Sequence, residues 1–142
     1  MNTLHSMLQS HPQASENLTV ISEALHALAL CEQVCLTCAD ACLAEESPET
    51  LRTCIRQDLD CAAICAATAS LLVRRTSSGA AVLHAQLHAC VLACQTCADV
   101  CSAHATHHEH CAVCARTCRS CQEKCNAALG EFSPAGLVQD EE

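Results

Sequence analysis

Cysteine is the residue type in this chain whose number and spacing could do chemistry. Sixteen of the 142 residues are cysteine, and within each of four groups they lie three, four or seven residues apart. The groups are Cys31, Cys35, Cys38 and Cys42; Cys54, Cys61 and Cys65; Cys90, Cys94, Cys97 and Cys101; and Cys111, Cys114, Cys118, Cys121 and Cys125. Residues at this heptad spacing lie on one stripe of a helix, where Leu or Ile normally enters a core. The sequence therefore predicts four helices that turn thiol groups toward a common core.

Thiols at this density favour metal binding over the two other roles of buried cysteine. The first basic residue is Arg52, so the chain does not begin like an export signal, and we expect a cytoplasmic protein whose thiols stay reduced. Disulfides are disfavoured because helix axes about 8–10 Å apart often place facing Cα atoms beyond the roughly 7 Å that a bridge tolerates. Packing alone is disfavoured because cysteine fills less volume than leucine at every core position.

Charge favours copper among the metals that bind thiolate. Sixteen buried thiolates carry sixteen negative charges, which a core of low dielectric accepts only when bound metal cancels them. Monovalent Cu(I) cancels them one for one, and soft thiolate ligands favour it. A four-thiolate zinc site keeps about two uncancelled charges, and an iron–sulfur protein needs separate sets of four cysteines. We therefore predict many Cu(I) ions per chain, with a zinc or mixed-metal buffer of the metallothionein type as the alternative.

Asp58 interrupts the cysteine stripe of the second helix. It lies four residues after Cys54 and three before Cys61, so it should face the core, where an unpaired carboxylate is costly. We predict Asp58 as a copper ligand. The alternative is a small rotation of the helix that lets this side chain reach solvent.

A second polar group gathers where the third helix ends and the fourth begins. His104 and His108 continue the stripe of Cys97 and Cys101, and His110 stands four residues before Cys114. A neutral imidazole can take a cuprous ion and pass it to thiolate, which binds it more strongly. We therefore predict His104, His108 and His110 as further copper-binding residues at a loading mouth, with His107 unassigned. The alternative is a solvated, histidine-rich turn.

Helix boundary signals divide the chain into long segments. Ser47-Pro48-Glu49 combines an N-cap with a first-turn proline and acid, and Thr106 with Glu109 is typical of a capping box. Arg74-Arg75 suit a helix C-terminus. The predicted helices lie near 14–45, 48–75, 79–105 and 107–130, after an N-terminal segment at 1–13 and before a flexible acidic tail at 131–142.

An internal repeat predicts how these helices are arranged. The stretches 31–42 and 90–101 agree at seven of twelve positions, and Cys54, Cys61 and Cys65 match Cys114, Cys121 and Cys125 at a constant offset. A duplicated helical hairpin closing on itself gives an all-α, antiparallel four-helix bundle. All thiols then lie in one half of the bundle. The other half should be hydrocarbon, where Leu18, Ile21, Leu25 and Leu28 meet Leu71, Leu72, Val82, Leu83 and Leu87.

Composition disfavours several other functions. A net charge of −9 with 7 basic residues disfavours nucleic acid as a partner. The longest uncharged run, 76–98, carries too many polar side chains for a membrane span. A ferritin-like oxidase needs two ExxH pairs in the bundle, and only Glu23-Ala-Leu-His26 fits, so we do not expect an enzyme.

The repeated CxxxCxTCADxC motif and the duplicated hairpin, with the expected lack of an export signal, together resemble one family. Over about residues 15 to 130 the chain is similar to the cytosolic copper storage proteins, bacterial four-helix bundles that fill their core with Cu(I). The resemblance implies storage or sequestration of cytosolic copper without catalysis, with all 16 cysteines as ligands and histidines marking the loading end. It also implies a homo-oligomer, with a tetramer favoured. Leu51 and Asp58 depart from the pattern, since the matching positions of the fourth helix are Cys111 and Cys118.

Overall fold

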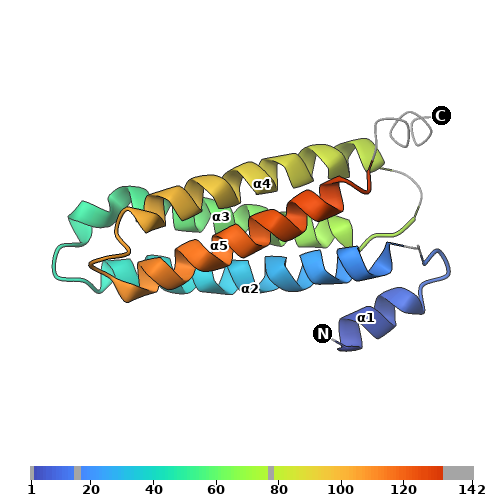
Figure 1. Cartoon of the computed structure of the whole chain (residues 1–142), viewed down its shortest axis with the longest axis horizontal. Helices are drawn as coiled ribbons and strands as arrows, with labels where there is room; N and C mark the ends of the chain where they lie inside the picture. The colour runs from blue at the N-terminus through green and yellow to red at the C-terminus, as the bar shows by residue number, and fades with distance from the viewer. Residues whose placement is uncertain (1, 15–16, 77–78, 133–142) are drawn as a thin grey trace.

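Four long helices form an antiparallel bundle in the computed structural model, which describes residues 2–14, 17–76 and 79–132. The bundle helices are α2 (Leu18–Leu43), α3 (Arg52–Leu72), α4 (Ala80–Ser102) and α5 (Glu109–Leu129), and the described residues include no strand. Each of these helices packs against two neighbours: α2 contacts α3 and α5, and α4 contacts the same two helices. The predicted all-α bundle is therefore confirmed (Figure 1).

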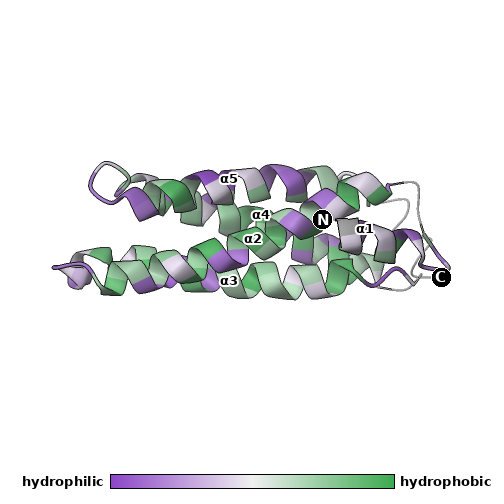
Figure 2. Ribbon diagram, turned by 90° about the horizontal axis from the view of Figure 1, so that it is seen from below, coloured by the Kyte–Doolittle hydropathy of each residue, from purple (hydrophilic) through white to green (hydrophobic). Residues whose placement is uncertain are grey.

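The connections sort the bundle into two ends. The connection from α2 to α3 and the connection from α4 to α5 lie at one end, on the left of Figure 1. The helix α1 (Asn2–Gln9) and the last turn of α5 lie at the other end. Figure 2 shows hydrophobic residues along all four bundle helices and hydrophilic residues in the turns of the first end.

The two predicted N-terminal caps differ from the structure. Pro48–Leu51 forms a 3-10 turn, η1, and the α-helix begins only at Arg52; the Ser47 side chain makes no cap hydrogen bond. The helix α5 begins at Glu109 rather than His107, and its N-cap is His108 in an extended conformation without a side-chain cap bond. The predicted capping box was therefore wrong. Thr106 lies two residues before the true cap, where its hydroxyl is in the wrong turn to serve the helix.

The C-terminus of α3 also differs from the prediction. The helix ends at Leu72, before the two arginines, and its last turn holds no basic residue. Arg75 instead donates a hydrogen bond to Oδ1 of Asn17, at 3.4 Å. The Arg75 guanidinium therefore reaches across to the residue that precedes α2, while Arg74 donates a hydrogen bond to the Ser70 hydroxyl of α3 at 3.3 Å.

The thiol-free half of the bundle is a packed hydrocarbon core. Ile21, Leu28, Leu72 and Leu87 are fully buried, and Leu25 and Leu83 nearly so. Burying each of these side chains contributes about 1.5–3 kcal/mol before entropy losses. Val82 was wrongly predicted to join them: it precedes Leu83, so the helical turn places it on the outer face, and it is 63% exposed.

The segment before Pro12 contributes a short helix that covers the end of this core. Leu8 of α1 is buried, and Leu4 packs against the core cluster. His5 Nδ1 lies 3.3 Å from the hydroxyl of the buried Ser22. Helix α1 therefore adds both apolar contact and a polar partner for Ser22 at the end away from the thiols.

The helices α2 and α4 are long and apolar enough to cross a membrane, judged by length and composition alone. That is weak evidence, since core helices of soluble bundles meet the same criterion. Each of these two helices carries four cysteines, which count as apolar residues and are all buried in the bundle.

We predict that the reduced apoprotein is already folded, because the hydrocarbon half packs without metal. Circular dichroism should show high helicity before copper is added. Leu28→Ala should lower the free energy of unfolding by about 2–5 kcal/mol, whereas the matched surface change Val82→Ala should alter it by less than about 0.5 kcal/mol. A coil spectrum in the reduced apoprotein would contradict this prediction.

Candidate metal centre

All 16 cysteines are buried, as the heptad spacing predicts. Each stripe turns its thiols inward because positions three and four residues apart lie on one face of a helix. One set of four sulfurs takes one member from each bundle helix: Cys31, Cys65, Cys94 and Cys121. The centre of this half of the bundle is therefore a column of sulfur rather than of hydrocarbon.

Neighbouring sets of ligands share atoms along the column. In each set the ligand atoms all lie within 4.8 Å of one another. Cys31 also belongs to a second set, with Cys35, Cys61 and Cys118. A third set shares Cys35 and Cys118 and adds Cys97 and Cys114. Nearer the turns, two sets share Cys38 and Cys54: one is completed by Cys42 and Cys111, the other by Asp58 and Cys101. Shared sulfurs suit bridging thiolates, each bound to two metal ions, better than separate four-ligand sites.

The distances between sulfurs suit metal binding and are too long for disulfides. Cys54 and Cys101 have their sulfurs 3.3 Å apart, and other neighbouring pairs lie at 3.6 to 4.0 Å. A disulfide needs about 2.05 Å. Two thiolates bound to one metal at about 2.3 Å are separated by about 3.8–4.0 Å in tetrahedral or trigonal geometry. All 16 cysteines are accordingly free thiols in the structure.

The column ends inside the bundle. Cys90 is its last thiol on α4, with sulfur distances of 4.0 Å to Cys65 and 3.9 Å to Cys125. Beyond it Thr68 is buried and accepts a hydrogen bond from Gln86 Nε2 at 3.0 Å. The hydrocarbon core described above follows, so the structure closes this end of the column.

Asp58 faces the thiols, and the interpretation that it reaches solvent was wrong. The side chain is fully buried. Its Oδ1 accepts hydrogen bonds from the thiols of Cys97, Cys114 and Cys101 at 3.1, 3.2 and 3.4 Å. Burial, followed by the nearby Cys114 sulfur, raises the pKa of Asp58 to about 8. The carboxyl group therefore sits where it could complete a ligand set with sulfur.

Two thiols near the connecting turns, Cys42 and Cys111, favour the protonated form in the absence of metal. Burial raises the pKa of the Cys111 thiol to about 11 and also raises the pKa of Cys42. A metal ion that binds these thiols must therefore displace a proton from each.

The histidines predicted at the mouth take up different positions. His110 lies against the thiols: its Nδ1 is 3.4 Å from the sulfur of Cys38 and 3.6 Å from that of Cys111. His108 stacks beside His110, with ring centroids 5.5 Å apart. His104 is half-buried in the turn and His107 is exposed. His110 is therefore the one of the three predicted ligands that the structure brings into contact with sulfur.

Glu45 is a mouth residue that the sequence reasoning missed. Its Oε2 lies 2.8 Å from His110 Nε2 and 3.1 Å from His108 Nδ1. The hydrogen bond from His110 is the main cause that lowers the pKa of Glu45 below its usual value. A signal was present: Glu45 lies three residues after Cys42 and so continues the heptad stripe of α2.

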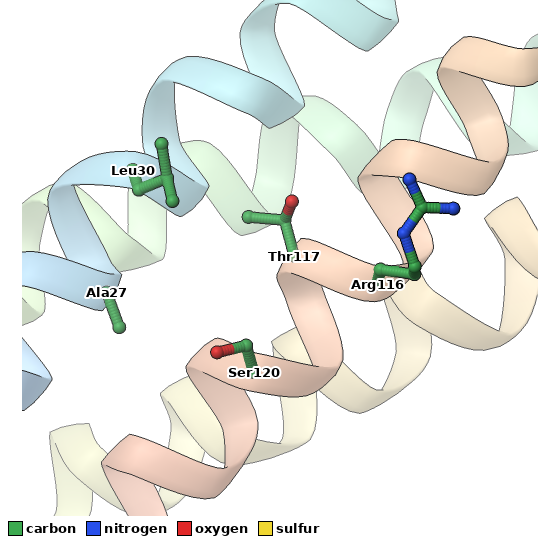
Figure 3. A pocket seen from close by; sticks show the side chains of 5 residues that line it. All are labelled: Ala27, Leu30, Arg116, Thr117 and Ser120. Atoms are coloured by element: carbon green, nitrogen blue, oxygen red, sulfur yellow. The ribbon is translucent and has the colours of Figure 1, made fainter.

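Two hollows on the outer surface hold no cysteine, although one of them borders His110 at the mouth. Figure 3 shows one of about 190 Å³ between α2 and α5, bordered by Ala27, Leu30, Arg116, Thr117 and Ser120. Another, of about 260 Å³, is lined by Gln33, Val34, Thr37, His110 and Val113. Neither lining includes a cysteine, so the candidate metal centre is the enclosed sulfur column.

A family model described as copper storage protein matches residues 17–130, which include every cysteine and all four bundle helices. The chain belongs to the copper storage protein family. The family resemblance predicted from the cysteine motifs is thus confirmed, and the sulfur column is the feature that suits this family's cargo.

Solved structures of other copper storage proteins share the fold. Ccsp from Streptomyces lividans, loaded with 10 copper equivalents, is 40% identical and has a TM-score of 0.86, covering 89% of this chain and 98% of its own. A cytosolic copper storage protein from the same organism, with five coppers, is 45% identical at a TM-score of 0.77, covering 79% and 93%. The chain is also 34% identical to the uncharacterized cysteine-rich protein YhjQ of Bacillus subtilis (strain 168), over 68% of this chain and 84% of that protein.

The donor set of this copper storage protein suits Cu(I), and the comparisons lend zinc no support. Sulfur distances near 3.8–4.0 Å fit either metal, so geometry at one site does not decide between them. The charge of the column and the sharing of sulfurs between sets favour Cu(I) over zinc. One monovalent ion for each buried thiolate leaves the column neutral, and thiolates that bridge two ions do not require separate tetrahedral sites.

We predict that Asp58→Asn separates the structural role of this side chain from its role in binding metal. Asparagine keeps an acceptor for the thiols, so the free energy of unfolding of the apoprotein should stay within about 1 kcal/mol of wild type. It is a poorer ligand than carboxylate, so capacity for Cu(I) should fall by about one ion. Thermal unfolding and anaerobic titration measure the two effects.

The matched control is Asp60→Asn. Asp60 forms an exposed pair with Arg56 at 3.0 Å, so its replacement should change neither stability nor capacity appreciably. Full capacity in Asp58→Asn would contradict the ligand role of Asp58.

Proposed function

We propose that this protein stores cuprous ions in the cytosol, with the thiolates of all 16 cysteines as ligands. The observation that carries the proposal is the sharing of sulfurs between neighbouring sets along a closed column. An ion can therefore sit between any adjacent sulfurs, and each added ion uses a thiolate already bound to its neighbour. Asp58 completes a ligand set with Cys38, Cys54 and Cys101, and the mouth histidines His104, His108 and His110 bind ions as they enter.

Copper reaches the column at the histidine end. His110 is partly exposed and also touches two thiols, so it can take an ion from solution and pass it to Cys38 or Cys111. Transfer from nitrogen to sulfur is favourable because Cu(I) prefers the softer ligand. At the opposite end, the described residues place the Thr68–Gln86 hydrogen bond and a buried hydrocarbon core between the column and solution.

The same proposal covers location, assembly and the absence of catalysis. A cytosolic location agrees with the Streptomyces relative and keeps the thiols reduced. Membership of a storage family supports a non-enzymatic role. The chain assembles as a homo-oligomer, with a tetramer favoured by the family resemblance, and needs neither nucleic acid nor membrane as a partner.

We predict that anaerobic titration with Cu(I) saturates at roughly 16 ions, one for each thiol, because this ratio leaves the buried column neutral. Metal analysis after gel filtration gives the ratio. Copper should displace bound zinc, and zinc should not displace copper. Saturation near four ions, or zinc that resists copper, would instead indicate separate tetrahedral sites.

We predict that replacing His104, His108 and His110 together with alanine slows copper uptake but leaves capacity within a few ions of wild type. The reason is that these side chains receive ions whereas the thiols hold them. Stopped-flow uptake from a weak cuprous donor gives the rate, and metal analysis of the same sample gives the endpoint.

His26→Ala with His88→Ala is the matched control, since these exposed histidines lie in the thiol-free half. An unchanged rate in the triple variant would eliminate the histidine route. A collapse of capacity would show that these histidines are storage ligands.

A further inference from the structure

One carboxylate oxygen links both helix connections at the thiol-rich end. Glu45 follows the end of α2, His108 is the N-cap of α5, and His110 lies in the first turn of α5. Oε2 of Glu45 lies 2.8 Å from His110 Nε2 and 3.1 Å from His108 Nδ1. All three side chains are partly shielded, with exposed fractions of 33%, 25% and 24% for Glu45, His110 and His108.

These contacts determine which ring nitrogen carries a proton. A carboxylate only accepts hydrogen bonds, so each nitrogen facing it carries N–H. His110 therefore holds its proton on Nε2, and in the neutral ring Nδ1 keeps a lone pair. That lone pair faces the sulfurs of Cys38 and Cys111 at 3.4 and 3.6 Å. His108 has the opposite arrangement, with its proton on Nδ1.

We propose that Glu45 is a positioning residue for copper loading: it holds the His110 ring with Nε2–H outward and the Nδ1 lone pair on Cys38 and Cys111. The role rests on the proposed function, because it matters only if ions pass through His110. Glu45 itself does not touch the thiols and acts through the ring. Carboxylates that orient a metal-binding histidine in this way change metal affinity or activity by about 10–100-fold when removed.

Without Glu45, the His110 ring loses the acceptor that fixes its outer edge. The ring can then turn about its side-chain bonds, and Nδ1 no longer faces the thiols in every molecule. Each loading event then waits for the ring to return to the competent orientation. The final capacity is unaffected, because the sulfur column is unchanged.

The first measurement uses the copper-free protein and does not depend on storage. Ring nitrogen-15 NMR of the reduced apoprotein near pH 8 should show His108 with its proton on Nδ1 and His110 with its proton on Nε2. In Glu45→Ala the His108 proton should leave Nδ1 in a large share of molecules. A wild-type spectrum without the Nδ1–H form of His108, or a Glu45→Ala spectrum that retains it fully, would overturn the proposal.

The second measurement is a double-mutant cycle on the rate of uptake from a weak cuprous donor. Glu45→Ala should slow uptake by about tenfold, Glu45→Gln should recover most of the rate because its amide oxygen accepts the same bonds, and Glu46→Ala should load as wild type. Glu46 is the matched control, an exposed carboxylate one residue further along the chain.

The decisive comparison places Glu45→Ala in a His110→Ala background. If Glu45 acts through His110, the double variant is no slower than His110→Ala alone. A normal rate in Glu45→Ala, or an equal further slowing in the double variant, overturns the positioning role while the storage function stands. Normal loading in His110→Ala overturns the histidine route and the role of Glu45 together, and a wild-type protein that binds no Cu(I) overturns the proposed function itself.

Discussion

Electrical neutrality of a buried sulfur column is the constraint on which the rest of this structure depends. A thiolate away from water is tolerated only beside a cation, and burial accordingly raises the pKa of Cys42 and Cys111 in the absence of metal. Metal binding and proton release are therefore one event. Asp58 follows the same rule. Its pKa is raised, and four thiols donate hydrogen bonds to its fully buried carboxyl group.

The two halves of the bundle have different roles: the hydrocarbon half stabilises the fold, and the thiol half provides the capacity for metal. Cysteine fills core positions with less volume than leucine, so the thiol half contributes less packing to the fold. The opposite half compensates with fully buried Ile21, Leu28, Leu72 and Leu87, and α1 covers its end. This division lets the same backbone hold empty thiols and filled ones. Long helices allow this division because the buried face of a single helix can carry thiols in one half and hydrocarbon side chains in the other.

Heptad spacing explains how much the sequence could predict. A stripe at three and four residues needs only helical geometry, so the burial of all 16 thiols and of Asp58 followed from spacing alone. Helix ends were less predictable, because cap bonds depend on the path of the chain: Thr106 falls in the turn rather than at the cap. Val82 was misplaced because an apolar residue type was given more weight than its position on the helix.

Glu45 was missed for a different reason. Its stripe position was visible, but its two histidine partners lie more than sixty residues away, and only folding shows that they meet at one oxygen. Contacts across the bundle between polar side chains leave no periodic signal in one sequence. The sulfur column itself repeats, and so it could be recognised.

The closed end of the column has a consequence for the order in which ions are exchanged. Sulfur continues from Cys42 near the turns to Cys125, where the hydrocarbon core begins. In a column with a single opening, the deepest ions are the first to arrive and the last to leave. The stored metal would then behave as two pools, a labile one near the histidines and a deep reserve around Cys90 and Cys125, which is drawn on only after the outer thiols have been emptied.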